Sequence, residues 1–206
     1  MVGEYLLSYN PETWRLDVPL LAESYPEISE DHLTYTFTIR EGVEWHDGEP
    51  FTTEDVLFSV KALMNPFADS ASLRGYFADL ADVGIEGRQV RFEMSKPYWS
   101  NDEALGGTLP FVAKHVYDPD GVLDNYSFAD LIAPDARNDA TLREFGEGFN
   151  AHPANRDPIG TGPFKFESWE SGSELVLVRN DGYWEGGRKP ISKKSSYGSS
   201  PMTPLG

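Results

Sequence analysis

The stretch that decides the fold is Leu33–Val60, which reads LTYTFTIREGVEWHDGEPFTTEDVLFSV. Residues Thr34–Arg40 alternate between polar and apolar side chains, so that the aromatic and aliphatic residues share one face. This period of two predicts a half-buried strand. His46-Asp47-Gly48 follows, and it is typical of a turn because Asp and Gly tolerate tight backbone bends. The stretch therefore opens with a strand and a turn.

A helix is predicted after this turn. Thr52 and Asp55 stand in capping-box register at its start. Asn65-Pro66 ends it, because the residue before a proline disfavours helical backbone. Apolar residues recur at helical spacing over Val56–Met64. The pattern predicts an amphipathic helix over Thr52–Met64.

Two hairpins are predicted further along the chain. One spans Asp82–Ser95 and turns at Glu86-Gly87, and the other spans Phe164–Arg179 and turns at Ser171-Gly172. Residues 101–150 lie between them and hold several turn-forming clusters, which indicate loops and short helices. The expected fold class is α+β, rich in hairpins and with few helices.

Length and charge limit the possible functions. The chain has 206 residues, enough for one large domain or two small ones. It carries 34 acidic and 17 basic residues, so its formal net charge is −17. Such a charge gives no electrostatic reason to bind nucleic acid or an anionic membrane surface. The chain has no Cys, which excludes disulfides and Cys nucleophiles.

No stretch approaches the roughly 20 apolar residues of a membrane span, so we expect no membrane-spanning segment. The first nine residues, MVGEYLLSY, lack a basic region, and Glu4 interrupts their short apolar run. We therefore expect no signal peptide in this chain.

Three further segments join Leu33–Val60 in a family resemblance. They are TWRLDVPLLAESYPEISED at 13–31, LPFVAKHVYD at 109–118 and PIGTGPFKFESWESGSELVLVRNDGYW at 158–184. In order, spacing and residue type, the four segments resemble family 5 of the extracellular solute-binding proteins. These are the peptide- and nickel-type binding components of bacterial ABC importers. The resemblance runs from Glu4 to about Pro190, and it departs from the family pattern mainly at Thr53, where Ala is usual.

The resemblance implies a bilobal periplasmic-binding-protein fold, which grips a ligand in a cleft and closes about a hinge. It implies that residues 1–190 form part of the first lobe, that about 41–157 include a small appended subdomain, and that the second lobe is absent. It implies a peptide as ligand and an ABC permease as partner, with no catalysis and no cofactor. The spacing of the four His residues predicts no metal site. The intact parent is then periplasmic or extracellular, and a lipid anchor is compatible with that location. We expect the chain as given to be truncated and non-functional.

Residues 191–206, ISKKSSYGSSPMTPLG, differ in composition from the rest, with five Ser, two Lys and no acid. If one nucleotide is missing just after Pro190, the restored frame reads P-Y-L-(K/E)-(K/E)-I-V-(V/I)-R-I-I-P-D-D-(T/A). That sequence resembles the family's continuation. We therefore predict a non-native, frameshifted tail. A flexible tag or linker is the alternative.

Two other functions stay open as alternatives: a stand-alone carbohydrate-binding module, and a hydrolase fragment that uses acidic and aromatic residues. A glycosidase needs two carboxylates facing each other across a sugar, and nothing in the sequence places such a pair. The four His lack a metal-ligand spacing such as H-x-x-x-H. Gly160-Thr161-Gly162-Pro163 lacks the Lys and the helix of a phosphate loop, and it predicts a close backbone crossing instead.

The candidate ligand-binding residues are Arg74 and Tyr76, in the segment Asp69–Asp79. In the resembled family this loop reaches toward the cleft between the lobes. Arg74 could pair with a ligand carboxylate, and Tyr76 could pack on a peptide or hydrogen-bond to it. The alternative is a surface arginine and a core tyrosine. The pairs Tyr98-Trp99 and Tyr183-Trp184 are expected in the core, and stacking on a ligand is the alternative.

Overall fold

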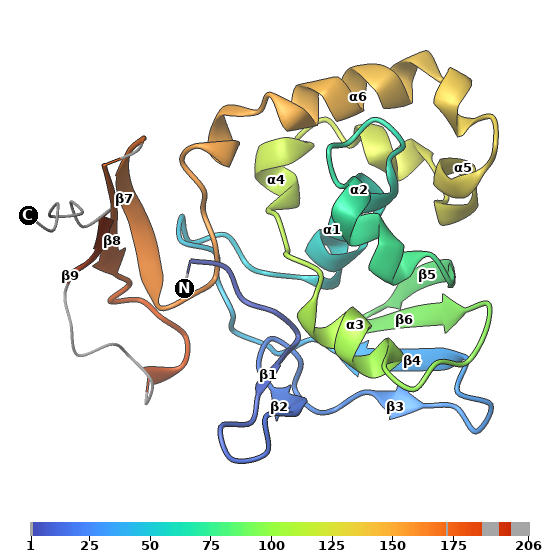
Figure 1. The fold of residues 1–206 in the computed structure, drawn as a ribbon, viewed down its shortest axis with the longest axis horizontal. Helices are drawn as coiled ribbons and strands as arrows, with labels where there is room; N and C mark the ends of the chain where they lie inside the picture. Colours follow the sequence, from blue (N-terminus) through green and yellow to red (C-terminus); the bar gives the residue numbers. More distant parts are fainter. Residues whose placement is uncertain (1, 172, 187–193, 199–206) are drawn as a thin grey trace, which may run out of the picture.

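The structure is a computed structural model that describes residues 2–171, 173–186 and the backbone of 194–198. Its strands form a two-stranded, a four-stranded and a three-stranded antiparallel sheet (Figure 1). The strands are β1 (Leu7–Tyr9), β2 (Leu16–Pro19), β3 (Glu27–Ile28), β4 (Thr34–Thr38), β5 (Leu80–Glu86), β6 (Gln89–Met94), β7 (Phe164–Glu170), β8 (Glu174–Arg179) and β9 (Lys194–Gly198).

The helices of the described chain all lie between β4 and β7 in sequence. They are α1 (Thr53–Met64), α2 (Ala71–Arg74), α3 (Asn101–Gly107), α4 (Lys114–Tyr117), α5 (Phe128–Ile132) and α6 (Ala140–Asn150), with 3-10 turns η1 (Gly75–Phe77), η2 (Val122–Asn125), η3 (Ala136–Asn138) and η4 (Pro153–Asn155). The α+β class is confirmed.

The four-stranded sheet has the order β3-β4-β6-β5 and carries the main core. Phe37 of β4 pairs with Val90 of β6, and its ring meets Phe92 edge-on at 5.8 Å. The threonines of β4 are half-buried on the opposite face, as the alternation predicts. The predicted strand and the β5–β6 hairpin are both confirmed.

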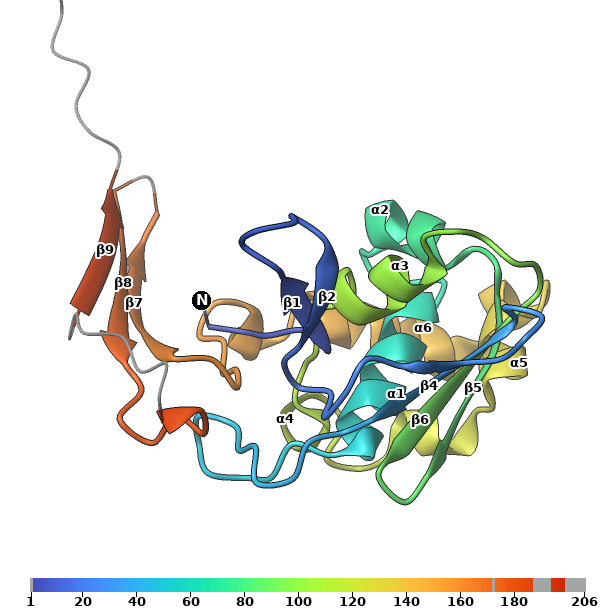
Figure 2. The same ribbon diagram turned by 90° about the horizontal axis from the view of Figure 1, so that it is seen from below.

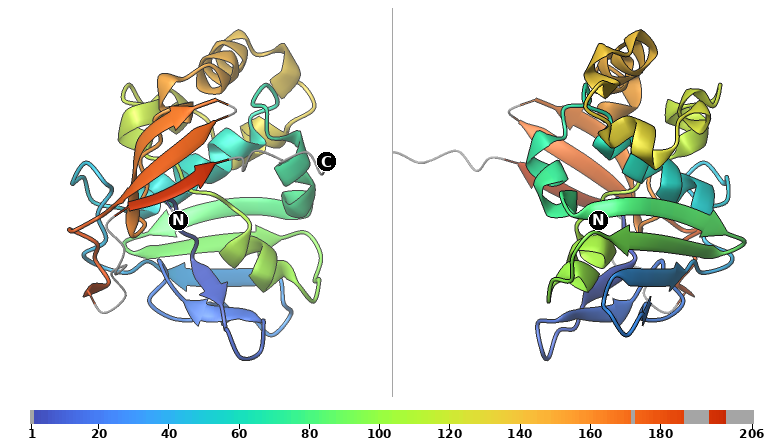
Figure 3. Two further views of the ribbon diagram at one scale, coloured as in Figure 1. Left: turned by 60° about the vertical axis from the view of Figure 1, so that its left-hand side comes forward. Right: turned by 90° about the vertical axis from the view of Figure 1, so that its right-hand side faces the viewer.

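Helix α1 lies between two layers, with the four-stranded sheet on one side and α5 and α6 on the other (Figure 3). Val56 and Val60 belong to the core of the sheet, whereas Phe58 and Ala62 belong to a second cluster with Leu142 of α6. A helix covered on both sides must be apolar on both sides. This explains why Phe58 stands outside the apolar stripe that faces the sheet.

The predicted helix start is confirmed. Thr52 caps α1, and its backbone N–H donates to Asp55 Oδ2 at 2.9 Å in a capping box. At the other end, Asn65 is fully buried and its Nδ2 donates to the carbonyl of Leu142 at 3.0 Å. Both ends of α1 are thus tied to the elements around it.

Residues 101–150 contain more helix than the expected loops and short helices, so the expectation of few helices is wrong. Helix α6 alone has 11 residues and is capped by Asp139, whose side chain accepts from the N–H of Leu142. Its glycines obscure the helical pattern in the sequence. Gly146 is required there, because a Cβ at this position would lie 2.7 Å from Phe67 Cβ.

The β7-β8-β9 sheet stands beside the main body (Figures 1 and 2). The predicted β7–β8 hairpin is confirmed, although residue 172 of its turn lies outside the described residues. The predicted frameshifted tail, 191–206, also lies outside them except for the backbone of 194–198, which pairs with β8. The origin of the tail stays a prediction.

Candidate functional site

Arg74, the first of the two candidate residues, ends α2 and points back to the end of α1. Its Nη1 donates to the carbonyls of Asn65 at 2.7 Å, Ala68 at 3.1 Å and Leu63 at 3.2 Å. It also contacts Ser70 Oγ at 3.0 Å. Arg74 therefore closes the C-terminal turn of α1 with one end of its guanidinium, a structural task that the sequence did not reveal.

Tyr76, the second candidate, lies in η1 and is exposed. Its side chain keeps 63% of its accessible surface, so the alternative of a core tyrosine is wrong. Phe77 beside it is fully buried and fixes η1 to the main core. Tyr76 is thus held in place by its neighbour while its own ring faces solvent.

Several aromatic side chains are exposed on segments that lie near the one that carries Tyr76. Helices α2 and α3 and the loop between β1 and β2 lie together along the upper edge of Figure 2. Helix α3 also contacts β1, β2 and η1. We call the exposed aromatic side chains of these segments the aromatic face. They are Tyr9 (64% exposed), Trp14 (79%), Tyr76 (63%), Tyr98 (53%) and Trp99 (79%).

The expectation that Tyr98-Trp99 lies in the core is therefore wrong. The centroids of the two rings lie 5.6 Å apart, directly before α3, and more than half of the surface of each residue is exposed. The matching expectation is confirmed for Tyr183, which is buried, and Trp184 is partly buried beside it. The two Tyr-Trp pairs look alike in the sequence, and their different burial depends on where the fold places each pair.

Helix α3 anchors the aromatic face to the sheet edge. Tyr25, which precedes β3, donates its hydroxyl proton to Asp102 of α3. Burial and the Asp102 carboxylate raise the pKa of Tyr25, so the hydroxyl stays protonated. This hydrogen bond fixes α3, the helix that directly follows Tyr98 and Trp99. The two exposed residues are therefore attached to a fixed element on their C-terminal side.

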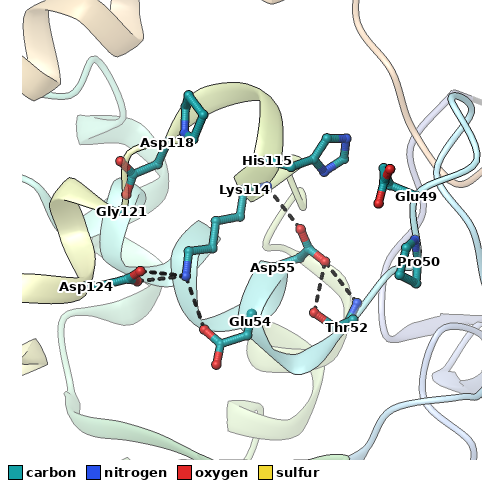
Figure 4. A pocket seen from close by; sticks show the side chains of 11 residues that line it. Glu49, Pro50, Thr52, Glu54, Asp55, Lys114, His115, Asp118, Gly121 and Asp124 are labelled. Carbon is teal, nitrogen blue, oxygen red and sulfur yellow. Dashed lines mark hydrogen bonds and ion pairs between the residues drawn. The ribbon is translucent and has the colours of Figure 1, made fainter.

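A different kind of hollow lies at the start of α1, between Glu49 and Pro50, α4 and η2 (Figure 4). It has a volume of about 410 Å³ and is lined by several acidic side chains. Lys114 Nζ lies 2.8 Å from Asp124 and 3.3 Å from Glu54, and His115 Nε2 lies 2.8 Å from Asp47. We call this site the acidic pocket.

The polar groups of the acidic pocket are engaged with the protein itself. Asp55 accepts from the backbone N–H groups of Thr52 and Lys114, at 2.9 and 3.0 Å. Asp118 accepts from the N–H groups of Val122 and Leu123 and so caps η2. These residues join the start of α1 to α4 and η2, and their arrangement stabilises the fold rather than presenting a free acid–base pair.

The His46 turn is joined to the glycine-rich segment that leads to β7. His46 Nδ1 accepts from the N–H of Gly160 at 3.1 Å, and Nε2 donates to the carbonyl of Gly162 at 2.9 Å. Burial lowers the pKa of His46, which keeps the ring neutral and able to accept. A Cβ at Gly160 would lie 2.1 Å from the carbonyl oxygen of Val2, so the predicted close crossing is confirmed.

A buried carboxylate holds the N-terminal segment to the same region. Glu4 is 5% exposed and accepts from the hydroxyl of Tyr183 at 2.5 Å and from Trp184 Nε1 at 3.1 Å. Burial raises the pKa of Glu4, and these two hydrogen bonds oppose the shift. Glu4 therefore connects residues about 180 positions apart in the sequence.

Metal ligands and membrane spans can be assessed for the described part of the chain. Across residues 2–171 and 173–186, no group of three or more His, Asp or Glu side chains is placed to hold a metal ion. Within the same residues, none of the helices combines the length and the apolar character needed to cross a bilayer.

Comparison with known proteins identifies the fold. A sequence profile described as bacterial extracellular solute-binding proteins, family 5 middle, matches residues 18–197. The chain is 31% identical to di/tripeptide-binding protein 2 of Pseudomonas aeruginosa, over 82% of this chain and 30% of that protein. It is 30% identical to the dipeptide-binding protein of Escherichia coli, over 84% of this chain and 30% of that protein.

Solved structures agree with these relatives. NikZ from Campylobacter jejuni in complex with Ni(L-His) matches with a TM-score of 0.74 and 29% identity, over 96% of this chain and 33% of that one. The oligopeptide-binding protein AppA from Bacillus subtilis, in complex with a nonapeptide, matches with a TM-score of 0.66 and 28% identity. The match covers 96% of this chain and 34% of the AppA chain. The chain thus spans about a third of the length of the proteins it matches.

Proposed function

This chain belongs to family 5 of the bacterial extracellular solute-binding proteins, and we propose that it provides one wall of the peptide-binding component of an ABC importer. Its fold corresponds to part of one lobe of that bilobal architecture. The partners in this proposal are a peptide and an ABC permease. The proposed place of action is the periplasm or the cell exterior.

The observation that carries the proposal is the aromatic face. A folded protein normally buries large aromatic rings, because each ring removes a large apolar area from water. Here five such rings are exposed on three separate segments, which come together where α3 contacts β1, β2 and η1. Aromatic rings offer apolar contact to peptide side chains, and a tyrosine hydroxyl adds a hydrogen bond.

Peptides are favoured over the alternatives by the relatives. The relative from Pseudomonas aeruginosa is a di/tripeptide-binding protein, and the one from Escherichia coli is a dipeptide-binding protein. The AppA structure holds a nonapeptide. The carbohydrate-binding and hydrolase alternatives find no such support. A role without catalysis follows for this chain in the proposal, since the family consists of binding proteins.

Within this proposal, Tyr76 packs on the peptide and Arg74 pairs with a ligand carboxylate. Tyr76 is exposed within the aromatic face. Arg74 uses Nη1 for the end of α1 and leaves the rest of its guanidinium for a ligand. Because a bilobal site needs two walls, the chain as given is truncated in this proposal and does not close a peptide site alone.

Titration calorimetry of a lengthened protein tests the proposal. If the predicted frameshift is correct, one base inserted after the Pro190 codon restores the family frame. The lengthened product is then titrated with a tripeptide, a disaccharide and Ni²⁺–histidine. We expect binding of the tripeptide, with no binding of the disaccharide. Binding of the disaccharide alone would overturn the proposal.

A further inference from the structure

A second cavity, of about 510 Å³, lies on the helical side of the molecule. The end of α1, α2, α5 and η3 form its walls, so it lies entirely within this chain. Two arginines line it: Arg74 from α2 and Arg137 from η3. We call it the arginine cavity. Its volume is within the range of about 300–1,000 Å³ typical of small-molecule sites.

Arg74 is fixed in this cavity by the end of α1. Its Nη1 makes the hydrogen bonds to Asn65, Ala68 and Leu63 described above. In the described part of the chain, its Nε and Nη2 have no hydrogen-bond partner. A guanidinium that is already oriented loses little freedom when it binds an anion, which favours binding.

Arg137 differs from the other basic residues. In the range 2–186, leaving out residue 172, it is the one Lys or Arg without a hydrogen bond, an ion pair or a cation–π contact. Acidic residues outnumber basic ones by 34 to 17 in this chain. An arginine left unpaired among so many carboxylates, beside a second arginine, is a natural partner for an external anion.

The two guanidinium groups repel each other across the arginine cavity. Burial and then the charge of Arg137 lower the pKa of Arg74, and the opposing attraction of Asp69 is weaker. Both groups keep their charge at neutral pH, because arginine is not deprotonated in proteins. An anion between them would relieve this repulsion and receive charge-assisted hydrogen bonds.

The remaining wall of the cavity is apolar and comes from Met64, Leu131, Ile132 and Pro134. Ile132 leaves 45% of its surface exposed, and it is one of the few large aliphatic side chains that do so. A fully hydrated inorganic anion would leave this wall uncovered. A ligand with both a charged end and an apolar end covers it and gains burial of apolar area.

We propose that the arginine cavity binds a small carboxylate with an apolar body, with the carboxylate between Arg74 and Arg137 and the apolar body against Ile132 and Leu131. The C-terminal residue of an apolar peptide and a short fatty acid share this chemistry. The inference rests on the proposed function in one respect, the pairing of Arg74 with a ligand carboxylate. It adds Arg137 as the second carboxylate partner and an apolar wall as the determinant of specificity.

The test is an NMR chemical-shift titration of the ¹⁵N-labelled 206-residue chain. Acetyl-leucine and hexanoate are the carboxylate probes, and acetyl-leucinamide and hexanamide are their neutral counterparts. We expect saturable shifts of the Arg74 side-chain signals with both carboxylates and at least tenfold weaker binding of both amides. The tighter of the two carboxylates identifies the peptide end or the fatty acid as the preferred source.

Two substitutions that each remove one positive charge are compared, one inside the cavity and one outside it as the control. Arg137→Gln removes the second guanidinium from an exposed position, and we expect at least tenfold weaker binding of acetyl-leucine. Arg91→Gln changes an exposed arginine that pairs with Glu93 on the sheet, and we expect less than a twofold change. Far-ultraviolet circular dichroism checks that both variants fold as the parent chain does.

The outcomes separate this inference from the proposed function. Tyr76→Ala weakens peptide binding to the lengthened protein, whereas Arg137→Gln weakens acetyl-leucine binding to the 206-residue chain. Loss of peptide binding by the unmutated lengthened protein, with acetyl-leucine binding intact, contradicts the proposed function alone. An unfolded chain, equal binding of acids and amides, or equal affinity of the Arg137→Gln variant would overturn the inference.

Discussion

The acidic pocket and the aromatic face contrast in how their side chains are used. In the acidic pocket, Asp55, Lys114 and Asp118 each hold partners within the protein, and together they join α1 to α4 and η2. On the aromatic face, Tyr76 and Trp99 have more than half of their surface in solvent. Polar groups that satisfy one another stabilise a fold, whereas supported but uncovered rings are available to a ligand.

This contrast separates conspicuous motifs from binding residues. The His46-Asp47-Gly48 turn and the Thr52–Asp55 capping box are the most distinctive parts of the sequence, and they hold elements together. The aromatic face has no motif of its own, because its residues come from separate loops. Four predictions test this division, beginning with the variant expected to have the largest effect.

Substitution Asp55→Ala should have the largest effect. Asp55 is 4% exposed and its loss leaves the N–H groups of Thr52 and Lys114 without their acceptor. We expect the free energy of unfolding to fall by about 3 kcal/mol, measured by urea denaturation. Glu54→Ala, one residue away and exposed, should cost less than about 1 kcal/mol. Equal effects of the two would contradict a structural role for the acidic pocket.

Acidification should destabilise the protein through His46. In the unfolded chain, His46 has the ordinary histidine pKa of about 6.5. Burial lowers the pKa of His46 in the folded chain. The stabilising contribution is therefore complete above about pH 6.5 and decreases as the pH falls below it, by at most about 1.4 kcal/mol per pH unit.

Urea denaturation at pH 7.5 and pH 5 measures this dependence. His46→Gln should reduce the stability difference between the two pH values, since the variant lacks the titrating group. His32→Gln, at an exposed turn residue, should retain the parent's pH dependence. An unchanged pH profile of the His46 variant would show that other groups cause the loss of stability.

Lys114→Met should have an intermediate effect. Burial disfavours the Lys114 ammonium, but hydrogen bonds to Asp124 and Glu54 outweigh it and raise the pKa of Lys114. We expect a loss of about 1 kcal/mol that decreases in 1 M salt. The matched variant Lys96→Met breaks an exposed pair with Asp79 and should cost less than about 0.5 kcal/mol. A larger loss for Lys96 would contradict the comparison.

Tyr76→Ala and Trp99→Ala should have the smallest effect on stability. Both rings are exposed, so the free energy of unfolding should change by less than about 0.5 kcal/mol. In the lengthened protein, however, each variant should bind a tripeptide at least tenfold more weakly by calorimetry. Unchanged affinity in both variants would remove the aromatic face from the proposed site.

The local elements can be predicted from the sequence. The way in which they pack against one another is harder to predict. The β4 strand, the capped α1 helix and both hairpins follow from periodicity and turn chemistry, which act over a few residues. Helix α6 was missed because Gly146 lowers helical propensity, and that glycine is needed for close packing against Phe67. The helix requires a tertiary contact that no local pattern contains.

The candidate site was predictable only in part. Tyr76 is exposed on the aromatic face, but the hydrogen bonds of Arg74 to the end of α1 depend on how the chain turns after Asn65. The sequence predicts Tyr98-Trp99 in the core because aromatic pairs usually lie there. Its exposure depends on the position of α3 against β1 and β2, which composition and spacing do not determine.

Hydrogen–deuterium exchange of the lengthened protein, with and without a tripeptide such as Ala-Leu-Ala, tests the central claim most directly. We predict that the peptide slows exchange in the segments around residues 9–14, 75–77 and 98–101. We predict no change in the acidic pocket at 52–55 and 114–124. Protection of the acidic pocket, with no change on the aromatic face, would contradict the account.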